Sequence, residues 1–540
     1  MGPDVETAKT KTVTGRPASA GLFRGPVCNF RKVENTAREK GSLEEEKTAL
    51  SMAISAALQD VERLVANTDD ADAAAILEFQ AAFLDDDALG EPAVALIESG
   101  MAANDAFKSV IDEMAGEYET AEDEYFAARA SDIRDLGARV LRRLHGQNEE
   151  FPNLPEGSVL LADDMAPSAF LSHDWQGRAI LLRQGSPSAH VAMLARSRGI
   201  PMVVGLADLV IEEGACVLID GDSGDVCISP DKAMERKFAE RIELESSTRM
   251  AEEKVRLSPV KTASGEAVAV YVNIADPSEL EALDVEACDG IGLVRTELLF
   301  YSENGLPDEG RQFETYAKIL KWAGTRPVTI RLLDAGGDKP ISGLTLENEQ
   351  NPFLGLRGVR LLLQNREVLK VQLRALLRAA VHGNLQIMVP MISVPEEMEQ
   401  VRSLLEEVKT ALGEEGISHG EARLGMMVEV PSTVFTLERF DADFFSIGSN
   451  DLTQYIMAAG RDSLAMARLA DTASPAVLLA IEMVVKAAAK ASIPVSLCGD
   501  AAGDKRVLPM LLQAGLRSFS VAPKLLGRTK LAISGWGEKS

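Results

Sequence analysis

The sequence predicts an α/β protein of several domains that ends in a (β/α)8 TIM barrel. From about residue 263 to residue 540 the chain alternates short apolar runs with helical stretches, and eight of these runs have the character of strands. Ahead of the barrel, residues 34–146 are poor in Gly and Pro and rich in Ala, Leu, Glu and Asp at helical spacing. Strand-like runs lie on both sides of that segment, in residues 11–33 and 147–228. We therefore expect a helical bundle inserted into an N-terminal α/β domain, followed by the barrel.

The individual elements follow along the chain. Residues 1–10 are polar and are expected to be disordered, and residues 34–146 are long enough for about four helices. Residues 229–262 are highly charged with intermittent apolar positions, which predicts a linker helix. The strands expected in the N-terminal α/β domain are 159–162, 179–182, 202–204 and 216–219. Those expected in the barrel are 267–272, 290–294, 328–333, 387–391, 424–428, 444–447, 495–498 and 519–521.

The composition limits the partners that the protein can have. A net charge of −27 argues against nucleic-acid binding, which needs a basic surface, and favours a basic partner. No apolar run reaches the roughly 18 residues that a membrane span needs, and the N-terminus lacks the apolar core of a secretory signal. The five cysteines are scattered without metal-binding spacing, which suggests reduced thiols. These features predict a cytoplasmic protein without membrane insertion.

Polar residues gather at the ends of the predicted barrel strands, where barrel enzymes keep their chemistry. Carboxylates suit Mg²⁺, and arginine forks match a multiply charged anion such as a phosphate. We therefore expect a site for Mg²⁺ and such an anion at the mouth of the barrel. For Ser449, Asn450 and Asp451 alone, capping of a helix N-terminus is the competing interpretation. The residues at or beyond the strand ends are Arg295, Glu297, Arg331, Asp334, Lys339, Arg357, Glu429, Asn450, Asp451, Arg461, Cys498 and Asp500.

A second candidate site lies in residues 185–196, where a loop of small residues leads into a helix that begins near His190. The N–H groups and the dipole of a helix N-terminus stabilise an anion, so a phosphate carried on His190 would be held there. A purely structural histidine is the competing interpretation.

Acidic residues cluster in the predicted helical bundle. Such clusters form either a solvated surface or a docking face for a basic protein. They consist of Asp69, Asp70, Asp72, Glu78, Asp85, Asp86, Asp87, Glu117, Glu119, Glu122, Asp123 and Glu124.

Six stretches of the chain are similar to one known family. They read FFSIGSNDLTQY, GIGLVRTELLF, LLDAGGDKP, NPFLGLRGVR, CGDAAGD and DEYFAARASDIRDLGARVLRRLHG. From about residue 15 to residue 525 the chain resembles Enzyme I, the phosphoenolpyruvate–protein phosphotransferase of the bacterial sugar phosphotransferase system. The resemblance implies that the N-terminal α/β domain is a swivelling phosphohistidine domain and that the barrel binds phosphoenolpyruvate.

The resemblance also implies a role for each site residue. Mg²⁺ would be held by Glu429 and Asp451, and Asp451 would also border the substrate. The phosphoryl group of phosphoenolpyruvate would be held by Arg295, Arg331 and Asn450, with Arg357 as a further contact, and its carboxylate by Arg461. His190 would accept the phosphoryl group, and Cys498 would protonate the enolate of pyruvate. The phosphoryl group would then pass to the carrier protein HPr, docked on the helical bundle, and the barrels would form a homodimer.

The chain departs from the usual family pattern mainly around His190. The family's loop usually reads Gly-Gly-x-Thr-Ser-His-Thr, whereas this chain has Ser186, Ser188, Ala189 and Val191, and Ala166 stands where threonine is usual. In the barrel, Gly460 replaces a usual Asp and Asp500 a usual Glu. The altered loop motivates an alternative, a specialised or regulatory paralogue with a non-standard HPr-like acceptor.

Two further alternatives differ in the chemistry that they require. A pyruvate-dikinase or phosphoenolpyruvate-synthase type of enzyme needs an ATP-binding domain ahead of the histidine domain, and this chain has no room for one. A paralogue that only docks partners would not be phosphorylated on His190.

Overall fold

The computed structural model divides the chain into two compact units, residues 1–246 and residues 247–540. Each unit is described by itself. The structure describes residues 10–30, 40–66, 71–85, 87–119, 124–146, 154–165, 167–187, 189–207, 209–300, 306–337, 339, 341, 343–345, 349–460, 466 and 468–537. The first nine residues, most of the stretch expected to be disordered, lie outside these ranges.

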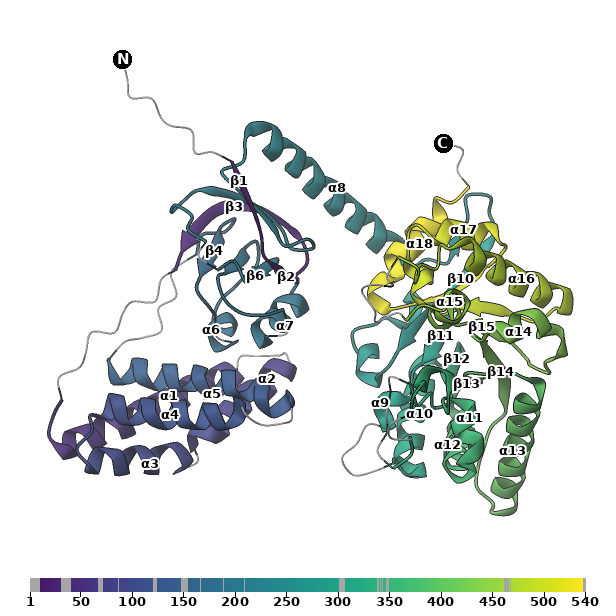
Figure 1. Cartoon of the computed structure of the whole chain (residues 1–540), viewed down its shortest axis with the longest axis horizontal. Helices are drawn as coiled ribbons and strands as arrows, with labels where there is room; N and C mark the ends of the chain where they lie inside the picture. Colours follow the sequence, from purple (N-terminus) through teal and green to yellow (C-terminus); the bar gives the residue numbers. More distant parts are fainter. Residues whose placement is uncertain are drawn as a thin grey trace. The chain divides into compact units, whose positions relative to one another are not determined.

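An eight-stranded sheet forms the centre of the N-terminal unit (Figure 1). Its strand order is β1-β8-β7-β3-β4-β5-β6-β2, with β3, β4, β5 and β6 parallel to their neighbours in that run and antiparallel pairing elsewhere. The four strands predicted after the helical segment are confirmed as β4, β5, β6 and β7. The bounds are β1 (Lys11–Thr14), β2 (Arg16–Ser19), β3 (Leu22–Asn29), β4 (Val159–Ala162), β5 (Ala179–Leu182), β6 (Met202–Val204), β7 (Cys216–Asp220) and β8 (Asp225–Ile228).

The central strands of this sheet are buried on both faces, which is why they appear in the sequence as continuous apolar runs. In β4, Leu160 and Ala162 belong to the core on one face, together with residues of α6 (Pro167–Leu171) and α7 (His190–Ser197). The alternate residues Val159 and Leu161 belong to the core on the other face, with residues of β7 and β8. The two-residue period of a strand thus places a layer on each side of the sheet.

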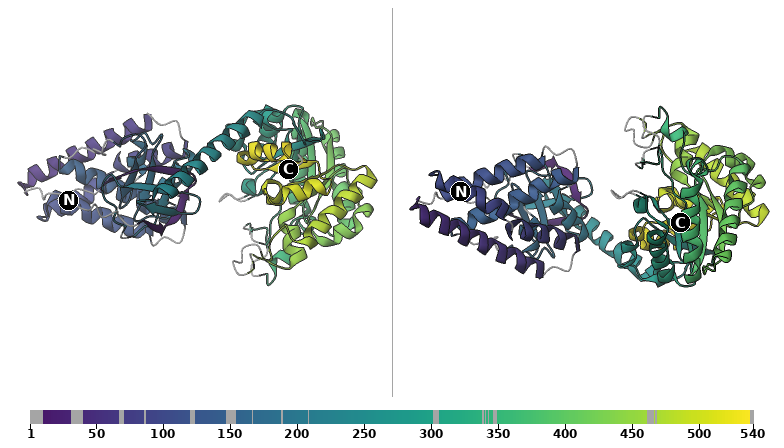
Figure 2. Two further views of the ribbon diagram at one scale, coloured as in Figure 1. Left: turned by 90° about the horizontal axis from the view of Figure 1, so that it is seen from above. Right: turned by 90° about the horizontal axis from the view of Figure 1, so that it is seen from below.

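Five helices lie alongside one another in the same unit, where about four were predicted (Figures 1 and 2). The described residues thus form one helix more than was predicted. Their shared core contains Leu50, Leu77, Phe107 and Ile133. The helices are α1 (Leu43–Ala66), α2 (Ala71–Asp85), α3 (Asp87–Glu98), α4 (Ala103–Glu119) and α5 (Glu124–Leu144). Next along the chain after the sheet comes a long charged helix, α8 (Lys232–Arg256), in which Phe238 is buried.

The C-terminal unit is a closed barrel of eight parallel strands, as predicted. The strands pair in sequence order, and β10 closes the ring by pairing with both β11 and β17. A two-residue strand, β9 (Val260–Lys261), adds antiparallel to β10 and was not predicted. Figures 1 and 2 show the helices outside the ring of strands. The barrel strands are β10 (Ala267–Ile274), β11 (Ile291–Val294), β12 (Pro327–Arg331), β13 (Asn384–Val389), β14 (Ala422–Val428), β15 (Phe445–Ile447), β16 (Val495–Leu497) and β17 (Ser518–Val521).

Several strand limits differ from the prediction, most clearly at β13. The apolar run was expected to continue as a strand to residue 391, but β13 ends at Val389. Pro390 has no N–H to donate, and Met391 has a left-handed backbone with φ of 59°. This turn brings the Met391 amide to the site described below.

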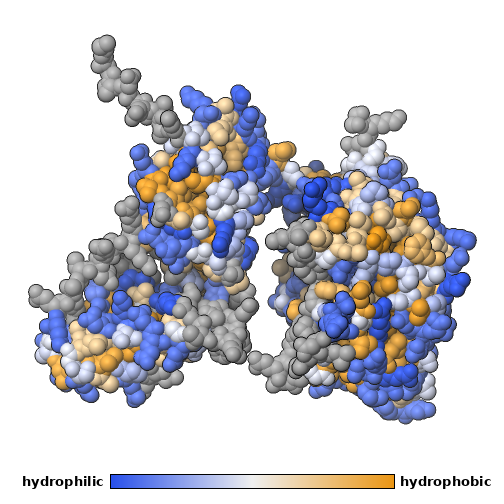
Figure 3. Space-filling view, in the orientation of Figure 1, coloured by the Kyte–Doolittle hydropathy of each residue, from blue (hydrophilic) through white to orange (hydrophobic). Residues whose placement is uncertain are grey.

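The outer ring of the barrel comprises α9 (Glu297–Phe300), α10 (Glu309–Ala323), α11 (Val359–Gln364), α12 (Arg366–Ala379), α13 (Pro395–Glu414), α14 (Pro431–Thr436), α15 (Ser449–Met457), α16 (Pro475–Ala491), α17 (Leu508–Gln513) and α18 (Leu526–Ser534). Among the helices that the structure describes, none has the length and apolar character needed to cross a membrane. Figure 3 shows hydrophilic residues mixed with smaller apolar areas over the face that it draws.

Candidate active site

A cavity of about 380 Å³ opens at the carboxyl ends of the barrel strands. Six residues to which the resemblance gives a role line it, together with Lys339, Asp500 and the glycines Gly448 and Gly499. A side chain on Gly448 would lie 2.9 Å from Oε2 of Glu429, and one on Gly499 would lie 1.9 Å from Oγ of Ser449. Both glycines therefore keep space open in the cavity. The six residues with a predicted role that line the cavity are Arg295, Arg331, Glu429, Asn450, Asp451 and Cys498.

The cations of the cavity come from Arg295, Arg331 and Lys339. Arg331 is the last residue of β12 and is buried, with Nη2 2.8 Å from Oε1 of Glu297 and Nη1 3.3 Å from Oδ2 of Asp334. Its Nε is buried without a hydrogen-bond partner. A buried donor without a partner is uncommon in folded proteins and suits a ligand that is absent here. Lys339 Nζ lies 3.4 Å from the same Asp334 oxygen.

Glu429 directly follows β14 and is fully buried. Its Oε1 accepts a hydrogen bond of 2.6 Å from the amide of Met391, whereas its Oε2 has no partner. Burial and the neighbouring carboxylates of Asp451 and Asp334 raise the pKa of Glu429 to about 8. A nearby positive charge would relieve this penalty.

The carboxylates of the cavity fit a magnesium ion. Mg²⁺ binds through one or two carboxylates plus water and substrate oxygens. Oε2 of Glu429 is an orphaned hard oxygen, and Gly448 leaves room beside it. Asp451 supplies a second carboxylate within the same cavity. No group of three or more His, Cys, Asp or Glu residues with metal-binding geometry occurs in the described parts of the chain.

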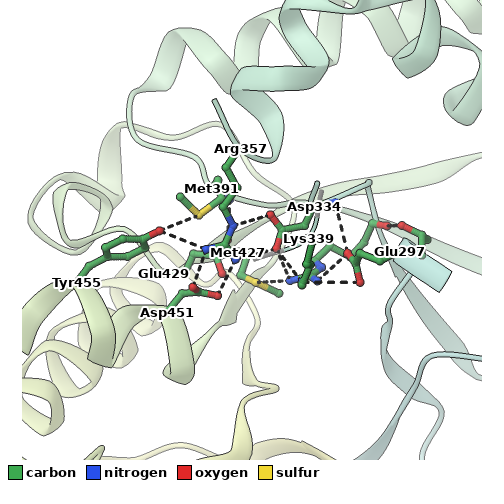
Figure 4. Close-up of polar contacts among 11 residues, drawn as sticks. Glu297, Asp334, Lys339, Arg357, Met391, Met427, Glu429, Asp451 and Tyr455 are labelled. Atoms are coloured by element: carbon green, nitrogen blue, oxygen red, sulfur yellow. Dashed lines mark hydrogen bonds and ion pairs between the residues drawn. The ribbon is translucent and has the colours of Figure 1, made fainter. Parts of the chain in front are cut away.

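Arg357 is fully buried, and its guanidinium joins two strand ends (Figure 4). Its Nε and Nη2 donate to the carboxylate of Asp334, each at 3.0 Å, and its Nη1 and Nη2 donate to Asp451 at 2.9 and 3.1 Å. Nη1 also donates to the hydroxyl of Tyr455 at 3.3 Å. These bonds use all five N–H donors of an arginine. Contact between Arg357 and a phosphoryl group stays a prediction and would require one of these bonds to break.

Asn450 and Asp451 lie in the first turn of α15. The helix has Gly448 as its N-cap and lacks a capping side chain. The interpretation of Ser449, Asn450 and Asp451 as N-caps is therefore wrong, because the helix begins one residue earlier than a capping role requires. Their side chains are available to the cavity instead.

Cys498 directly follows β16 and is buried in the wall of the cavity. Its Sγ lies 3.7 Å from the carbonyl oxygen of Ile447. Burial raises the pKa of the Cys498 thiol. The group therefore keeps its proton at neutral pH and has one to donate.

His190 is the first residue of α7 in the N-terminal unit. The N-cap is Ala189, and no side chain caps the helix. Arg196, one turn and a half later, donates hydrogen bonds to the carbonyl oxygens of Pro187 and Ala18, at 2.8 and 2.7 Å. These bonds fix the loop against β2. The half-buried imidazole thus lies at the positive end of a helix dipole.

Family models match three parts of this chain. They are described as the PEP-binding domain of PEP-utilising enzymes over residues 249–536, their N-terminal part over residues 14–129 and their mobile domain over residues 154–224. The phosphoenolpyruvate-protein phosphotransferase of Priestia megaterium is 36% identical, with 95% of this chain and 92% of that protein covered. The chain belongs to the Enzyme I family of phosphoenolpyruvate–protein phosphotransferases.

Other Enzyme I relatives agree. The phosphoenolpyruvate-protein phosphotransferase of Staphylococcus aureus is 34% identical, with 96% of this chain and 92% of that protein covered. Multiphosphoryl transfer protein 2 of Escherichia coli (strain K12) is 32% identical; the match covers 99% of this chain but only 65% of that longer protein. The family assignment made from the six sequence stretches is confirmed.

The structure brings together most, but not all, of the residues predicted to act in this Enzyme I chain. Arg461, Ala166 and Ser188 lie outside the described residues, as do Asp69, Asp70, Asp86, Glu122 and Asp123 of the acidic clusters. Arg357 lies beneath the cavity lining, and His190 belongs to the other unit. Glu297, Asp334 and Lys339 were expected at the strand ends without a stated role, and Tyr455 was not expected in the site.

A sequence signal existed for some of these residues. Glu297, Asp334 and Lys339 follow predicted strands, but their mutual pairing does not show in the sequence. Lys339 returns to the cavity because Gly336 and Gly337 adopt φ of 100° and 69°, and residues 336 and 339 form an isolated β-bridge. Tyr455 gave no signal beyond its place four residues after Asp451, on the same helix face.

Proposed function

We propose that this chain takes the phosphoryl group of phosphoenolpyruvate onto His190 and passes it to a histidine of an HPr-like carrier protein, as the first step of a sugar phosphotransferase system. The observation that carries this proposal is the barrel cavity. It joins three cations, a buried carboxylate with an unused oxygen and a protonated thiol. Phosphoenolpyruvate needs each of them: cations for its phosphoryl oxygens, a metal-binding carboxylate and a proton for its methylene carbon.

The cations of the cavity bind and orient the substrate. Arg331 is held by Glu297 and Asp334, which leaves its buried Nε to donate to a phosphoryl oxygen. Arg295 and the free N–H of the Asn450 amide add further donors, and Arg461 takes the substrate carboxylate. Glu429 and Asp451 would hold Mg²⁺, which would supply charge neutralisation at the phosphoryl oxygens. Fixed donors of this kind lower the barrier because they need no reorganisation during the reaction.

The first transfer moves the phosphoryl group from oxygen to nitrogen. A ring nitrogen of His190 attacks phosphorus, the P–N bond forms, and the bond between phosphorus and the enol oxygen breaks. The enolate of pyruvate leaves. Cys498 then gives its thiol proton to the methylene carbon, which yields pyruvate, and the thiolate takes a proton back from solvent. The raised pKa of Cys498 supports this role, because the thiol is protonated when the enolate forms.

The second transfer breaks the P–N bond on His190 and forms the same bond on the carrier. We assign residues 11–33 and 147–228 to a swivelling phosphohistidine domain, residues 34–146 to carrier docking, residues 229–262 to the linker and residues 263–540 to the barrel domain. Exposed acidic residues on the bundle support a basic carrier: Glu78 and Asp85 on α2, and Glu117 on α4.

A homodimer through the barrel is also part of the proposal. Three large apolar side chains are exposed on the loops and helices near the mouth: Leu354 (67%), Val394 (46%) and Phe435 (74%). Arg360 bonds to the Leu354 carbonyl and to Oγ of Ser393, and Ser432 bonds to the Ser393 carbonyl, so the three lie on joined segments. Exposed apolar patches are typical of contact surfaces. All five cysteines are free thiols, which supports a cytoplasmic protein.

A labelling experiment tests the proposed function. Wild-type protein and His190→Ala are incubated with Mg²⁺ and phosphoenolpyruvate carrying a radioactive phosphorus. We expect label on the wild type alone, lost on mild acid treatment as for a phosphohistidine, and transferred when HPr is added. Label on both proteins, or on neither, contradicts the assignment. The names of the relatives do not favour the specialised alternative. That alternative would be supported if the label passed to a non-standard carrier but not to a general HPr.

A further inference from the structure

Asp500 holds the amide of Asn450 from both ends, and Oγ of Ser449 also donates to its Oδ1 at 3.4 Å. Nδ2 of Asn450 donates to Oδ2 of Asp500 at 2.9 Å, and the backbone amide of Asp500 donates to Oδ1 of Asn450 at 3.0 Å. Asn450 is the second residue of α15, and Asp500 begins the short helix η7 (Asp500–Gly503), fifty residues later. Both residues line the barrel cavity.

The two bonds fix which end of the amide faces which way. The carboxylate of Asp500 can only accept, so the NH₂ group of Asn450 must face it, while the carbonyl oxygen of Asn450 faces the backbone N–H of Asp500. If the amide were flipped, its carbonyl oxygen would face the carboxylate of Asp500 and its NH₂ group would face the backbone N–H. A primary amide has two N–H groups, and Asp500 uses one of them. The second N–H of Nδ2 is left as the donor that Asn450 can offer to a substrate in the cavity.

The backbone is shaped for this contact. A side chain at residue 499 would approach Oδ1 of Asn450 to 2.9 Å and Oγ of Ser449 to 1.9 Å. Gly499 therefore allows the turn before η7 to lie directly against the start of α15. The carboxylate of Asp500 lines a cavity that otherwise suits an anion, and its negative charge repels the substrate. Its hydrogen bond to the amide of Asn450 explains why an acidic residue is present there.

We propose that Asp500 is a positioning residue that orients the Asn450 amide toward the phosphoryl group of phosphoenolpyruvate. This inference rests on the proposed function. Asp500 makes no bond to the substrate in this scheme and acts only through Asn450. Removing its carboxylate would take away the acceptor of Nδ2, so that binding loses a preorganised donor.

A double-mutant cycle separates this role from a structural one. The proteins are wild type, Asn450→Ala, Asp500→Ala and the double variant, with Asp500→Asn as the conservative replacement. Initial rates of His190 phosphorylation give kcat and KM for phosphoenolpyruvate. In a His190→Ala background, which does not turn over, calorimetry gives the Kd of phosphoenolpyruvate in the presence of Mg²⁺. Thermal unfolding monitors the fold.

We expect Asp500→Ala to lower kcat/KM and weaken binding by about tenfold, as for loss of one oriented donor. Asp500→Asn keeps an oxygen that accepts from Nδ2 and is expected to stay within about threefold of wild type. The double variant is expected to be no worse than Asn450→Ala, because both changes remove the same contact. Asp504→Ala is the matched control: it removes the same charge four residues away, where the carboxylate pairs with Arg506, and should leave kcat/KM unchanged.

Additive losses in the double variant would overturn the inference, since Asp500 would then act independently of Asn450. Equal losses for Asp500→Asn and Asp500→Ala would overturn it too, because charge and not the amide contact would matter. Failure of the proposed function is a separate result: wild-type protein would take no label from phosphoenolpyruvate.

Discussion

At the scale of single residues, two buried atoms define the barrel site. Nε of Arg331 and Oε2 of Glu429 belong to side chains that line the cavity, and neither has a hydrogen-bond partner. The remaining polar atoms of these two side chains are bound by Glu297, Asp334 and Met391. Leaving a buried polar atom unpaired costs about 1–3 kcal/mol. The unpaired donor, Nε of Arg331, suits an anion, and the unpaired acceptor, Oε2 of Glu429, suits a cation, so the cavity matches a ligand that contains both.

The carboxylate of Glu429 can be tested by an isosteric change. Glu429→Gln keeps an oxygen for the Met391 amide but removes the charge. We expect the rate of His190 phosphorylation to fall by about 100-fold, because charge stabilisation at the reacting phosphoryl group is lost. The midpoint of thermal unfolding should stay level or rise, since burial of a charged Glu429 is unfavourable. Glu399→Gln on the exposed surface of α13 is the matched control, and a wild-type rate for Glu429→Gln would contradict the assignment.

At the scale of elements, ion pairs tie the outer helices of the barrel together. Glu309, the first residue of α10, accepts from Arg374 at 2.7 Å and from Arg378 at 2.6 Å, both on α12. Arg374 also bonds to Glu415, which directly follows α13. Burial alone would raise the pKa of Glu309, but the bonds from the two arginines outweigh it and lower that pKa.

The lowered pKa makes a pH prediction. A carboxyl whose pKa is lower in the folded state stabilises it above the unfolded value of 4.5, and the contribution is lost as pH falls through the folded value. Glu309→Gln is therefore expected to reduce the free energy of unfolding by about 1 kcal/mol near neutral pH. Urea unfolding at several pH values should show this difference shrinking below pH 4.5. A difference that stays constant down to pH 3 would contradict the role of the ionised group.

The strands and helices were largely predictable from the sequence, whereas the contacts between side chains in the site were not. Buried parallel strands appear as apolar runs that end in polar residues, which is why all eight barrel strands and their site-bearing ends could be found. The limit of β13 was missed because an apolar run continues through Pro390 and Met391 while the backbone turns. Arg357 was predicted as a ligand contact, but its partners Asp334 and Asp451 lie 23 and 94 residues away in the chain. Distance in sequence hides such a network from any local pattern.

At the scale of the whole molecule, charge distinguishes the two transfers. The chain has a net charge of −27, so a basic carrier is attracted over distances set by ionic strength. Phosphoenolpyruvate is an anion and is drawn instead by the local cations of the barrel cavity. A change of surface charge on the bundle should therefore alter transfer to the carrier and leave the reaction with phosphoenolpyruvate unchanged.

A charge reversal on the bundle tests this separation. Glu78 and Asp85 are exposed and lie seven residues apart on α2, which places them on one face. The double variant Glu78→Lys/Asp85→Lys is expected to slow phosphoryl transfer to HPr by about tenfold at low salt, and by less at high salt. Labelling of His190 by phosphoenolpyruvate should not change.

The control carries the same change of charge on the other unit. Glu399 and Glu406 are exposed and also lie seven residues apart, on α13. If Glu399→Lys/Glu406→Lys slows transfer to HPr as much as the bundle variant does, the effect is one of net charge and the bundle is not the docking face.

The distribution of the cysteines has a practical consequence for chemical labelling. Cys288 and Cys498 in the barrel are buried, whereas Cys28, Cys216 and Cys227 in the N-terminal unit are half-buried. Alkylating reagents attack the accessible thiolate, and burial raises the pKa of both barrel thiols. A maleimide dye applied to the native protein should therefore mark the N-terminal unit and spare Cys498. An attached fluorophore could then report phosphorylation of His190 without removal of any native cysteine.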